Sequence, residues 1–188
     1  MLRTFIVYVA DHPGVLNRVS SLFRRRGYNI ESLTVGHTHL PGISRMTAVV
    51  AIDETGARLV EANLYKLAEV RQVEDITSVP SLHRELVIAK IAASADTRPE
   101  VMRVVEAFHA RVLEVGAEWL VIEATGSEET IDSLLEGIRP YGIVEMSRTG
   151  RVAMTRGRAA VLSEPAAAVS TRPIWNLAHS ATTPRNCS

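Results

Sequence analysis

The sequence predicts an α+β protein built from two tandem ferredoxin-like domains, each with the element order β-α-β-β-α-β. Three observations lead to this prediction. First, apolar residues recur with the period of a strand or of a helix, in that order, over residues 1–79. Second, the same order of segments returns from Glu85. Third, 188 residues suffice for two small domains. The rules for chain connections fold each half into an antiparallel four-stranded sheet with both helices on one face.

The first predicted strand covers residues 2–10 and contains the β-branched and aromatic run FIVYVA. It ends at Asp11-His12-Pro13-Gly14, a cluster of turn-forming residues. A helix follows, because five apolar residues share one stripe at helical spacing: Val15, Leu16, Val19, Leu22 and Phe23. The three arginines at 24–26, followed by Gly27, are typical of a helix C-terminus.

The rest of the first half predicts a hairpin, a helix and a last strand. Residues 29–38 and 44–52 form two strands joined by a loop that contains Pro41-Gly42. A helix over residues 56–68 and a strand over residues 70–79 complete the unit. The inward side of that helix is predicted to carry Leu59, Val60, Leu64 and Leu67.

The second half repeats this plan with little residue-level similarity. LVIAKIA after Glu85 is a strand, Pro99 begins a helix that runs to Ala110, and residues 111–115 and 119–124 pair as short strands. Ser127 caps a further helix. Its inward residues are Ile131, Leu134, Leu135 and Ile138, and a last strand runs over residues 143–154.

We therefore expect an N-terminal domain over residues 1–79, a second domain over residues 80–158 and a flexible tail over residues 159–188. The tail is rich in Ala, Ser, Thr and Pro and has no sustained periodicity.

Composition excludes several classes of protein. Twenty-one basic and twenty-one acidic residues cancel, so charge alone draws neither nucleic acid nor an anionic membrane. Cys187 is the only cysteine, which excludes an internal disulfide scaffold or a thiolate metal cluster. No apolar run approaches 18 residues, and the apolar start is too short for a signal sequence. A soluble, cytoplasmic protein is expected.

The first strand-to-helix turn is the most informative candidate site. Gly14 has no Cβ, so a ligand can approach its backbone, and the free N–H groups of the following helix suit a carboxylate. Asp11 could meet an ammonium group or act as a turn and cap residue. Asn29, which can donate and accept hydrogen bonds, opens the neighbouring strand with Ile30. This corner could hold a small amino acid, although the spacing alone favours an ordinary tight turn with a capped helix.

Catalytic and metal sites find little support. His37 and His39 share a face of a strand, but no Cys, Asp or Glu nearby in sequence completes a metal site, so solvent-facing histidines are expected. No catalytic or nucleotide-binding motif occurs. A hydrolase of acylphosphatase type on this fold needs an arginine in the first loop, and the run ADHPG has none.

RNA-recognition modules share the same β-α-β-β-α-β element order. They need exposed aromatic residues on the two central strands. Here those strands offer little beyond Phe5 and Tyr8, and the net charge is zero, so RNA binding is not expected.

Five blocks of the sequence resemble the regulatory (small) subunit family of acetolactate synthase, also called acetohydroxyacid synthase. These blocks are FRRRGYNIESLTVG (23–36), GISRMT (42–47), LYKLAEVRQVEDIT (64–77), RELVIAKI (84–91) and SRTGRVAMTRG (147–157). The resemblance runs in register over about residues 2–158. The RGYNIESL block is specific to this family, whereas the turn at Gly14 is not.

The resemblance implies that the first half is an ACT domain, a small-molecule sensor. Two ACT domains are expected to pair side by side and to bind valine, or leucine or isoleucine, at their interface. The implied effector-binding residues are Asp11, His12, Pro13, Gly14, Val15, Leu16, Asn29 and Ile30. Family members vary at the positions of Asp11, His12 and Pro13, so the preferred amino acid stays open.

The resemblance also implies a non-catalytic chain with no catalytic residue, metal or cofactor of its own. The expected partner is the large subunit, which would carry thiamine diphosphate, magnesium and FAD and perform the synthase reaction. This chain would activate that subunit and confer feedback inhibition by valine in branched-chain amino acid biosynthesis. The alternative is a stand-alone ACT-domain sensor or co-regulator without a catalytic partner.

Overall fold

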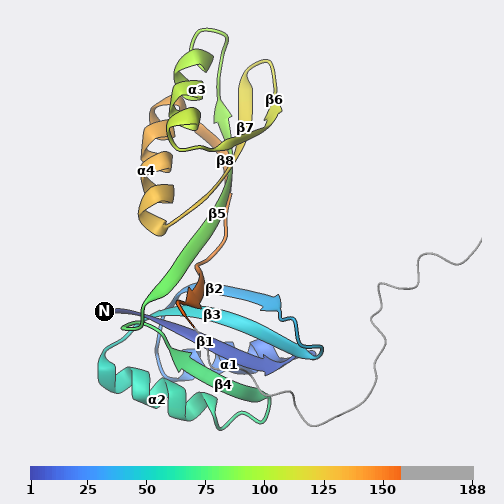
Figure 1. Cartoon of the computed structure of the whole chain (residues 1–188), viewed down its shortest axis with the longest axis vertical. Coiled ribbons are helices and arrows are strands. Elements are labelled where there is room, and N and C mark those ends of the chain that lie inside the picture. Colours follow the sequence, from blue (N-terminus) through green and yellow to red (C-terminus); the bar gives the residue numbers. More distant parts are fainter. Residues whose placement is uncertain (158–188) are drawn as a thin grey trace, which may run out of the picture.

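The computed structural model describes residues 1–157 and contains two antiparallel sheets in succession, each with two helices on one face (Figure 1). The predicted fold class is confirmed. The tail predicted over residues 159–188, and residue 158 of the predicted second domain, lie outside the described residues. Within residues 1–157, no helix is both long enough and apolar enough to cross a membrane.

The first sheet has the strand order β2-β3-β1-β4. Its elements are β1 (Leu2–Ala10), α1 (Val15–Arg25), β2 (Ile30–His37), β3 (Ile43–Ala51), α2 (Glu54–Leu64) and β4 (Val70–Asp75). Helix α2 begins two residues earlier than predicted, because the Asp53 side chain accepts a hydrogen bond from the Gly56 N–H at 2.7 Å. It also ends four residues earlier, and the prediction that Leu59 turns inward is wrong, since its side chain is exposed.

The second sheet has the equivalent order β6-β7-β5-β8. Its elements are β5 (Ser81–Ala92), α3 (Arg98–Ala107), β6 (Arg111–Val115), β7 (Trp119–Gly126), α4 (Glu128–Ile138), a 3-10 turn (Arg139–Tyr141), β8 (Ile143–Arg148) and β9 (Val152–Thr155). As predicted, Ser127 caps α4, its Oγ accepting from the Thr130 N–H at 3.3 Å. The inward residues of α4 are buried as predicted.

Each sheet has its own apolar core on the side of its helices. The first core is centred on Phe5 and Phe23, which are fully buried, and the second on Ile91, Leu120 and Ile138. Full burial of one such side chain stabilises the fold by about 1.5–3 kcal/mol. The helices therefore cover one face of each sheet and leave the other face available for contacts.

The last part of the chain departs from the prediction. Residues 143–154 were expected to form one strand, but the turn Thr149-Gly150-Arg151 divides them into β8 and β9. Strand β9 continues in the direction of β8 and pairs with the first third of β5, which therefore begins at Ser81 rather than near Glu85. It lies on the face of the first sheet that the helices leave free, where Ala153 packs against Ile6 and Ile76 (Figure 1).

Candidate functional site

The turn between β1 and α1 leaves the start of the helix open. Gly14 is the N-cap residue and adopts a left-handed conformation with φ of 89°, and no side chain caps the helix. The first turn of α1 contains no acidic residue. A Cβ built at Gly14 would have nothing within 4 Å. The amide groups at the start of α1 therefore carry partial positive charge that no side chain neutralises.

Asp11 is tied to the first sheet by its backbone and its side chain. Its N–H donates to the Gly42 carbonyl at 2.9 Å, and its Oδ1 accepts from Ser44 Oγ at 3.1 Å. Its Oδ2 lies 3.1 Å from His37 Nδ1. These contacts fit the predicted role of Asp11 as a turn residue. Both of its carboxylate oxygens have protein partners.

The other predicted residues of this loop differ in what they can offer. His12 and Pro13 are exposed, and His12 Nδ1 lies 3.3 Å from the Pro13 carbonyl oxygen. The Val15 side chain is only 4% exposed and belongs to the core, so only its backbone can face a ligand. Leu16 is 45% exposed and could supply an apolar wall.

Asn29 and Ile30 do not share this corner within one chain, so the expectation of a single corner is wrong for one copy. Ile30 pairs with Val50 at one end of β3, whereas the Gly14 turn lies at the other end, where His37 pairs with Ser44. Helix α1 has 11 residues and separates the two sites by about 16 Å. Both residues instead border a hollow of about 430 Å³ beside the C-terminal end of α1, and Asn29 Nδ2 donates to Glu31.

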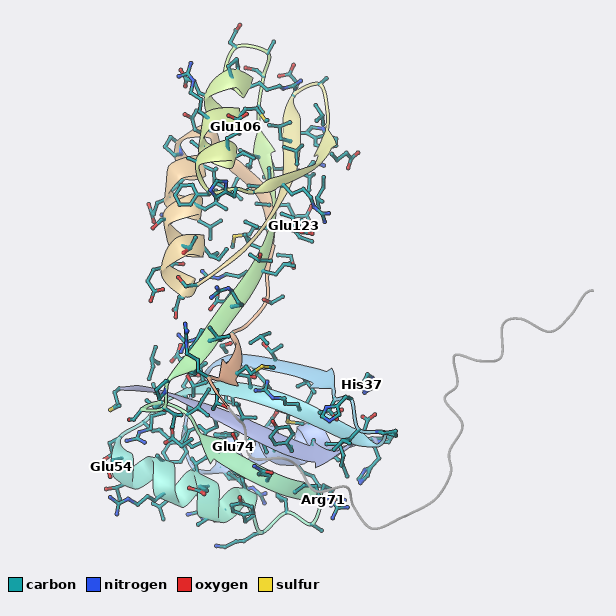
Figure 2. The ribbon with its side chains drawn as sticks, viewed as in Figure 1. His37, Glu54, Arg71, Glu74, Glu106 and Glu123 are labelled. Carbon is teal, nitrogen blue, oxygen red and sulfur yellow. The ribbon has the colours of Figure 1, made fainter. Side chains whose placement is uncertain are left out.

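His37 and Ser44 are the residues that sequence reasoning missed at this site. His37 was considered only as a metal ligand or a solvent-facing side chain, and it is indeed 82% exposed. Figure 2 shows it at the end of the first sheet opposite to Glu54. The predicted hairpin about Pro41-Gly42 could have indicated these two residues, because it sets His37 and Ser44 opposite each other.

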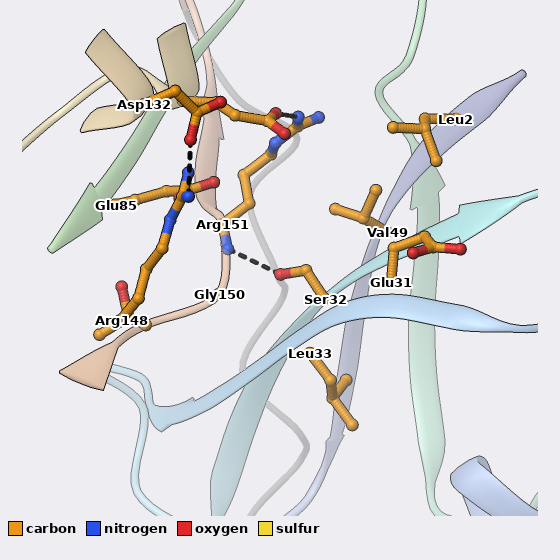
Figure 3. A pocket seen from close by; sticks show the side chains of 12 residues that line it. Leu2, Glu31, Ser32, Leu33, Val49, Glu85, Asp132, Arg148, Gly150 and Arg151 are labelled. Atoms are coloured by element: carbon orange, nitrogen blue, oxygen red, sulfur yellow. Dashed lines mark hydrogen bonds and ion pairs between the residues drawn. The ribbon is translucent and has the colours of Figure 1, made fainter. Parts of the chain in front are cut away.

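A second group of charged residues lines a cleft of about 510 Å³ between the two sheets (Figure 3). Arg148 contacts Glu85 at 2.6 Å and Asp132 at 2.7 Å. Arg151 contacts Glu128 and donates to Thr4 Oγ1 at 3.1 Å. The carboxylate partners of both arginines lie in the second half of the chain, whereas the contact of Arg151 with Thr4 joins the two halves. Neither arginine of this cleft is left without a carboxylate partner among the described residues.

The backbone of the same cleft is tightly packed. The Arg151 N–H donates to Ser32 Oγ at 2.8 Å, so the turn after β8 rests on β2 (Figure 3). A Cβ at Gly150 would overlap the Ser32 hydroxyl and lie 2.8 Å from Thr34 Oγ1. Sequence reasoning missed Gly150 and Arg151, although both belong to the block SRTGRVAMTRG.

Comparison with known families gives two matches that together span most of the described residues. Residues 5–72 match the family described as an AHAS small subunit-like ACT domain. Residues 84–157 match the family described as the small subunit of acetolactate synthase. The turn at Gly14 and strand β2 fall in the first match, and the turn at Gly150 falls in the second.

Relatives with this name align over nearly their whole length. A probable acetolactate synthase small subunit of Archaeoglobus fulgidus is 44% identical over 157 residues, which cover 84% of this chain and 98% of the relative. The acetolactate synthase small subunit of Bacillus subtilis is 40% identical, covering 84% of this chain and 92% of the relative.

The crystal structure of the acetolactate synthase small subunit of Thermotoga maritima superimposes with a TM-score of 0.79 at 33% identity. The superposition covers 85% of this chain and 99% of the Thermotoga chain. Fold, sequence blocks and relatives thus agree, and the chain belongs to the acetolactate synthase small-subunit family.

Proposed function

We propose that this chain is the regulatory subunit of an acetolactate synthase: it activates a catalytic large subunit and lowers that activity when valine binds between two ACT domains. The observation that carries the proposal is the open start of α1 at Gly14 in a chain of this family. The synthase chemistry, with thiamine diphosphate, magnesium and FAD, belongs in this proposal to the large subunit.

The start of α1 suits the carboxylate of an amino acid. Uncapped amide N–H groups and the helix dipole both favour a negative group at this position. Gly14 leaves the approach free, because no atom lies within 4 Å of the position that its Cβ would occupy. The exposed side chain of Leu16 provides apolar surface for a branched side chain of the ligand.

A second copy of the chain would complete the site. Strand β2 is an edge of the first sheet, hydrogen-bonded to β3 on one side, and such an edge is able to pair with another strand. A two-fold axis beside the middle of β2, between the two edge strands, would set its first residues beside the last residues of the partner copy's β2. Asn29 and Ile30 of one copy would then lie near the Gly14 turn of the other, the arrangement that the effector-binding prediction requires.

Regulation requires that valine bind one arrangement of the assembly more tightly than another, since equal affinity shifts no equilibrium. A coupling free energy of about 1–3 kcal/mol is usual, which corresponds to a change of about 5-fold to 150-fold. Because β2 also holds the turn at Gly150 through Ser32, a change in its pairing would be felt by the second sheet.

Reconstitution tests this proposal. The large subunit should be inactive or weakly active alone, more active with this chain, and inhibited as valine is titrated. A large subunit indifferent to this chain would contradict the proposal and favour the stand-alone sensor. Acetolactate formation by this chain alone would contradict its non-catalytic role.

Calorimetry with the Gly14→Asp variant tests the effector site itself. The new carboxylate would occupy the position proposed for the effector carboxylate, so valine binding should be lost. Gly157→Asp is the matched control, because Gly157 also has a positive φ of 83° with nothing within 4 Å of a Cβ. Unchanged valine affinity in Gly14→Asp would refute the assignment of the site.

A further inference from the structure

The proposed effector site at the start of α1 has an acidic residue, Asp11, next to it. Asp11 belongs to the same four-residue turn as Gly14, whose following amides are proposed to receive the effector carboxylate. An unbalanced carboxylate near that position would oppose a second carboxylate by like-charge repulsion. The Asp11 side chain is 40% accessible to solvent.

The structure places two donors on that carboxylate, one from each strand of the β2–β3 hairpin. Ser44, on β3, is 6% exposed and occupies Oδ1, and His37, the last residue of β2, occupies Oδ2. Among residues 1–157, His37 is the only basic side chain within 4.0 Å of Asp11. Its Nδ1 donates to the carboxylate in the protonated imidazole and in the neutral tautomer that carries its proton on Nδ1.

We propose that His37 supports effector binding indirectly, through its contact with Asp11. By engaging Asp11 it keeps that carboxylate against the hairpin and offsets its charge, so that the start of α1 accepts the carboxylate of an amino acid. This inference rests on the proposed function, and it adds a residue to the eight predicted from the sequence. His37 acts through Asp11 and is therefore a positioning residue for the effector.

The inference has a direct consequence for pairs of substitutions. If His37 acts by offsetting the charge of Asp11, its removal matters only while that charge is present. In His37→Ala, valine affinity should fall by about threefold to tenfold, the range expected for like charges several ångströms apart near a protein surface. In the Asp11→Asn background the same His37→Ala substitution should change valine affinity by less than about twofold.

A matched histidine provides the control. His39 is also exposed and lies two residues further along the chain, but it makes no side-chain hydrogen bond or ion pair within the described residues. His39→Ala should therefore leave valine affinity unchanged. Thermal unfolding of all variants establishes that they are folded, which is expected because His37 is 82% exposed.

Ionic strength separates a charge effect from a packing effect. The difference in valine affinity between the wild-type chain and His37→Ala should become smaller as the salt concentration rises from about 0.05 to about 1 M, because salt screens the repulsion between Asp11 and the valine carboxylate. A loss that is independent of salt, or one that persists in the Asp11→Asn background, would overturn the inference.

The outcomes distinguish this inference from the proposed function. Calorimetry is carried out on the full chain with valine, and with leucine and isoleucine as further ligands. A wild-type chain that binds none of them would overturn the proposed function and this inference with it. A wild-type chain that binds valine, with His37→Ala binding it equally well, would overturn the role of His37 alone.

Discussion

Gly14, at the start of α1, and Gly150, in the turn after β8, show opposite uses of the same residue type. Gly14 has a positive φ of 89° and open space around the position of its missing Cβ. Gly150 has an ordinary φ, but a Cβ there would collide with Ser32 and lie 3.2 Å from the Leu33 backbone nitrogen. Glycine at position 14 leaves a helix start open to a ligand, whereas glycine at position 150 lets two halves of the chain pack closely.

The two regions differ in the same way in their charges. At the Gly14 turn the helix amides have no side-chain cap, and one exposed pair, Asp11–His37, balances the corner. At the Gly150 turn every arginine is matched to a carboxylate. Polar groups that have no side-chain partner and face open space indicate a binding site. Polar groups that are paired with each other in a packed cleft indicate a structural junction.

The largest effect on stability is expected from Gly150→Ala. The added methyl group would push the turn away from β2 and break the hydrogen bond from Arg151 to Ser32, which should lower the free energy of unfolding by about 1–3 kcal/mol. Gly36→Ala is the control, because Gly36 lies in β2 with nothing within 4 Å of a Cβ. Urea denaturation measures both, and equal stabilities would remove the contrast between the two regions.

A smaller loss of stability is expected from Gly14→Ala. Alanine has room at this position but must adopt a left-handed conformation, which costs about 1 kcal/mol. The same denaturation series measures this loss, and calorimetry should show that valine affinity still falls, because the backbone that presents the amides is shifted. Stability as low as that of Gly150→Ala would contradict the distinction between strain and overlap.

Two exposed leucines, one on each helix of the first sheet, should differ in their effect on valine binding while their substitution leaves stability nearly unchanged. Leu16→Ala should weaken valine binding by about threefold to tenfold, the value of about one or two buried methylene groups. Leu59→Ala is the control, since Leu59 is 49% exposed on α2 and lies outside the proposed site. Both unfolding free energies should stay within about 0.5 kcal/mol of the parent chain.

The smallest effect concerns a histidine at the junction. Burial lowers the pKa of His83 below its ordinary value, and the charge of Arg151 lowers it further. Arg151→Ala should therefore raise the pKa of His83, which an NMR titration of its imidazole protons would follow. An unchanged or lower pKa would show that Arg151 does not act on this side chain.

The direction of the His83 shift also sets a pH dependence. Because the folded chain holds His83 below its unfolded pKa, the unfolded chain binds the proton more readily. The stability associated with neutral His83 is complete above the unfolded pKa and declines as the pH falls toward the folded pKa. Arg151→Ala should narrow the pH range between the folded and the unfolded pKa of His83, over which this stability is lost.

Much of the fold was determined by the sequence, because local periodicity decides which segments are strands and which are helices. The stripe from Val15 to Phe23, the cap at Ser127 and the hairpin about Pro41-Gly42 each specify an element through nearest neighbours along the chain. The repeated order of these elements, with the rules for chain connections, then leaves few arrangements, and both observed sheets follow the predicted one, apart from the added strand β9.

Tertiary structure alone decided which residues meet. Gly14 and Asn29 seemed to form one corner, but α1 separates them, because a helix that returns along a sheet carries the next strand to its far end. The pairing of His37 with Asp11, and the contact of Gly150 with β2, join residues 26 and 118 positions apart in sequence. Periodicity describes only neighbours, so such contacts depend on how whole elements pack.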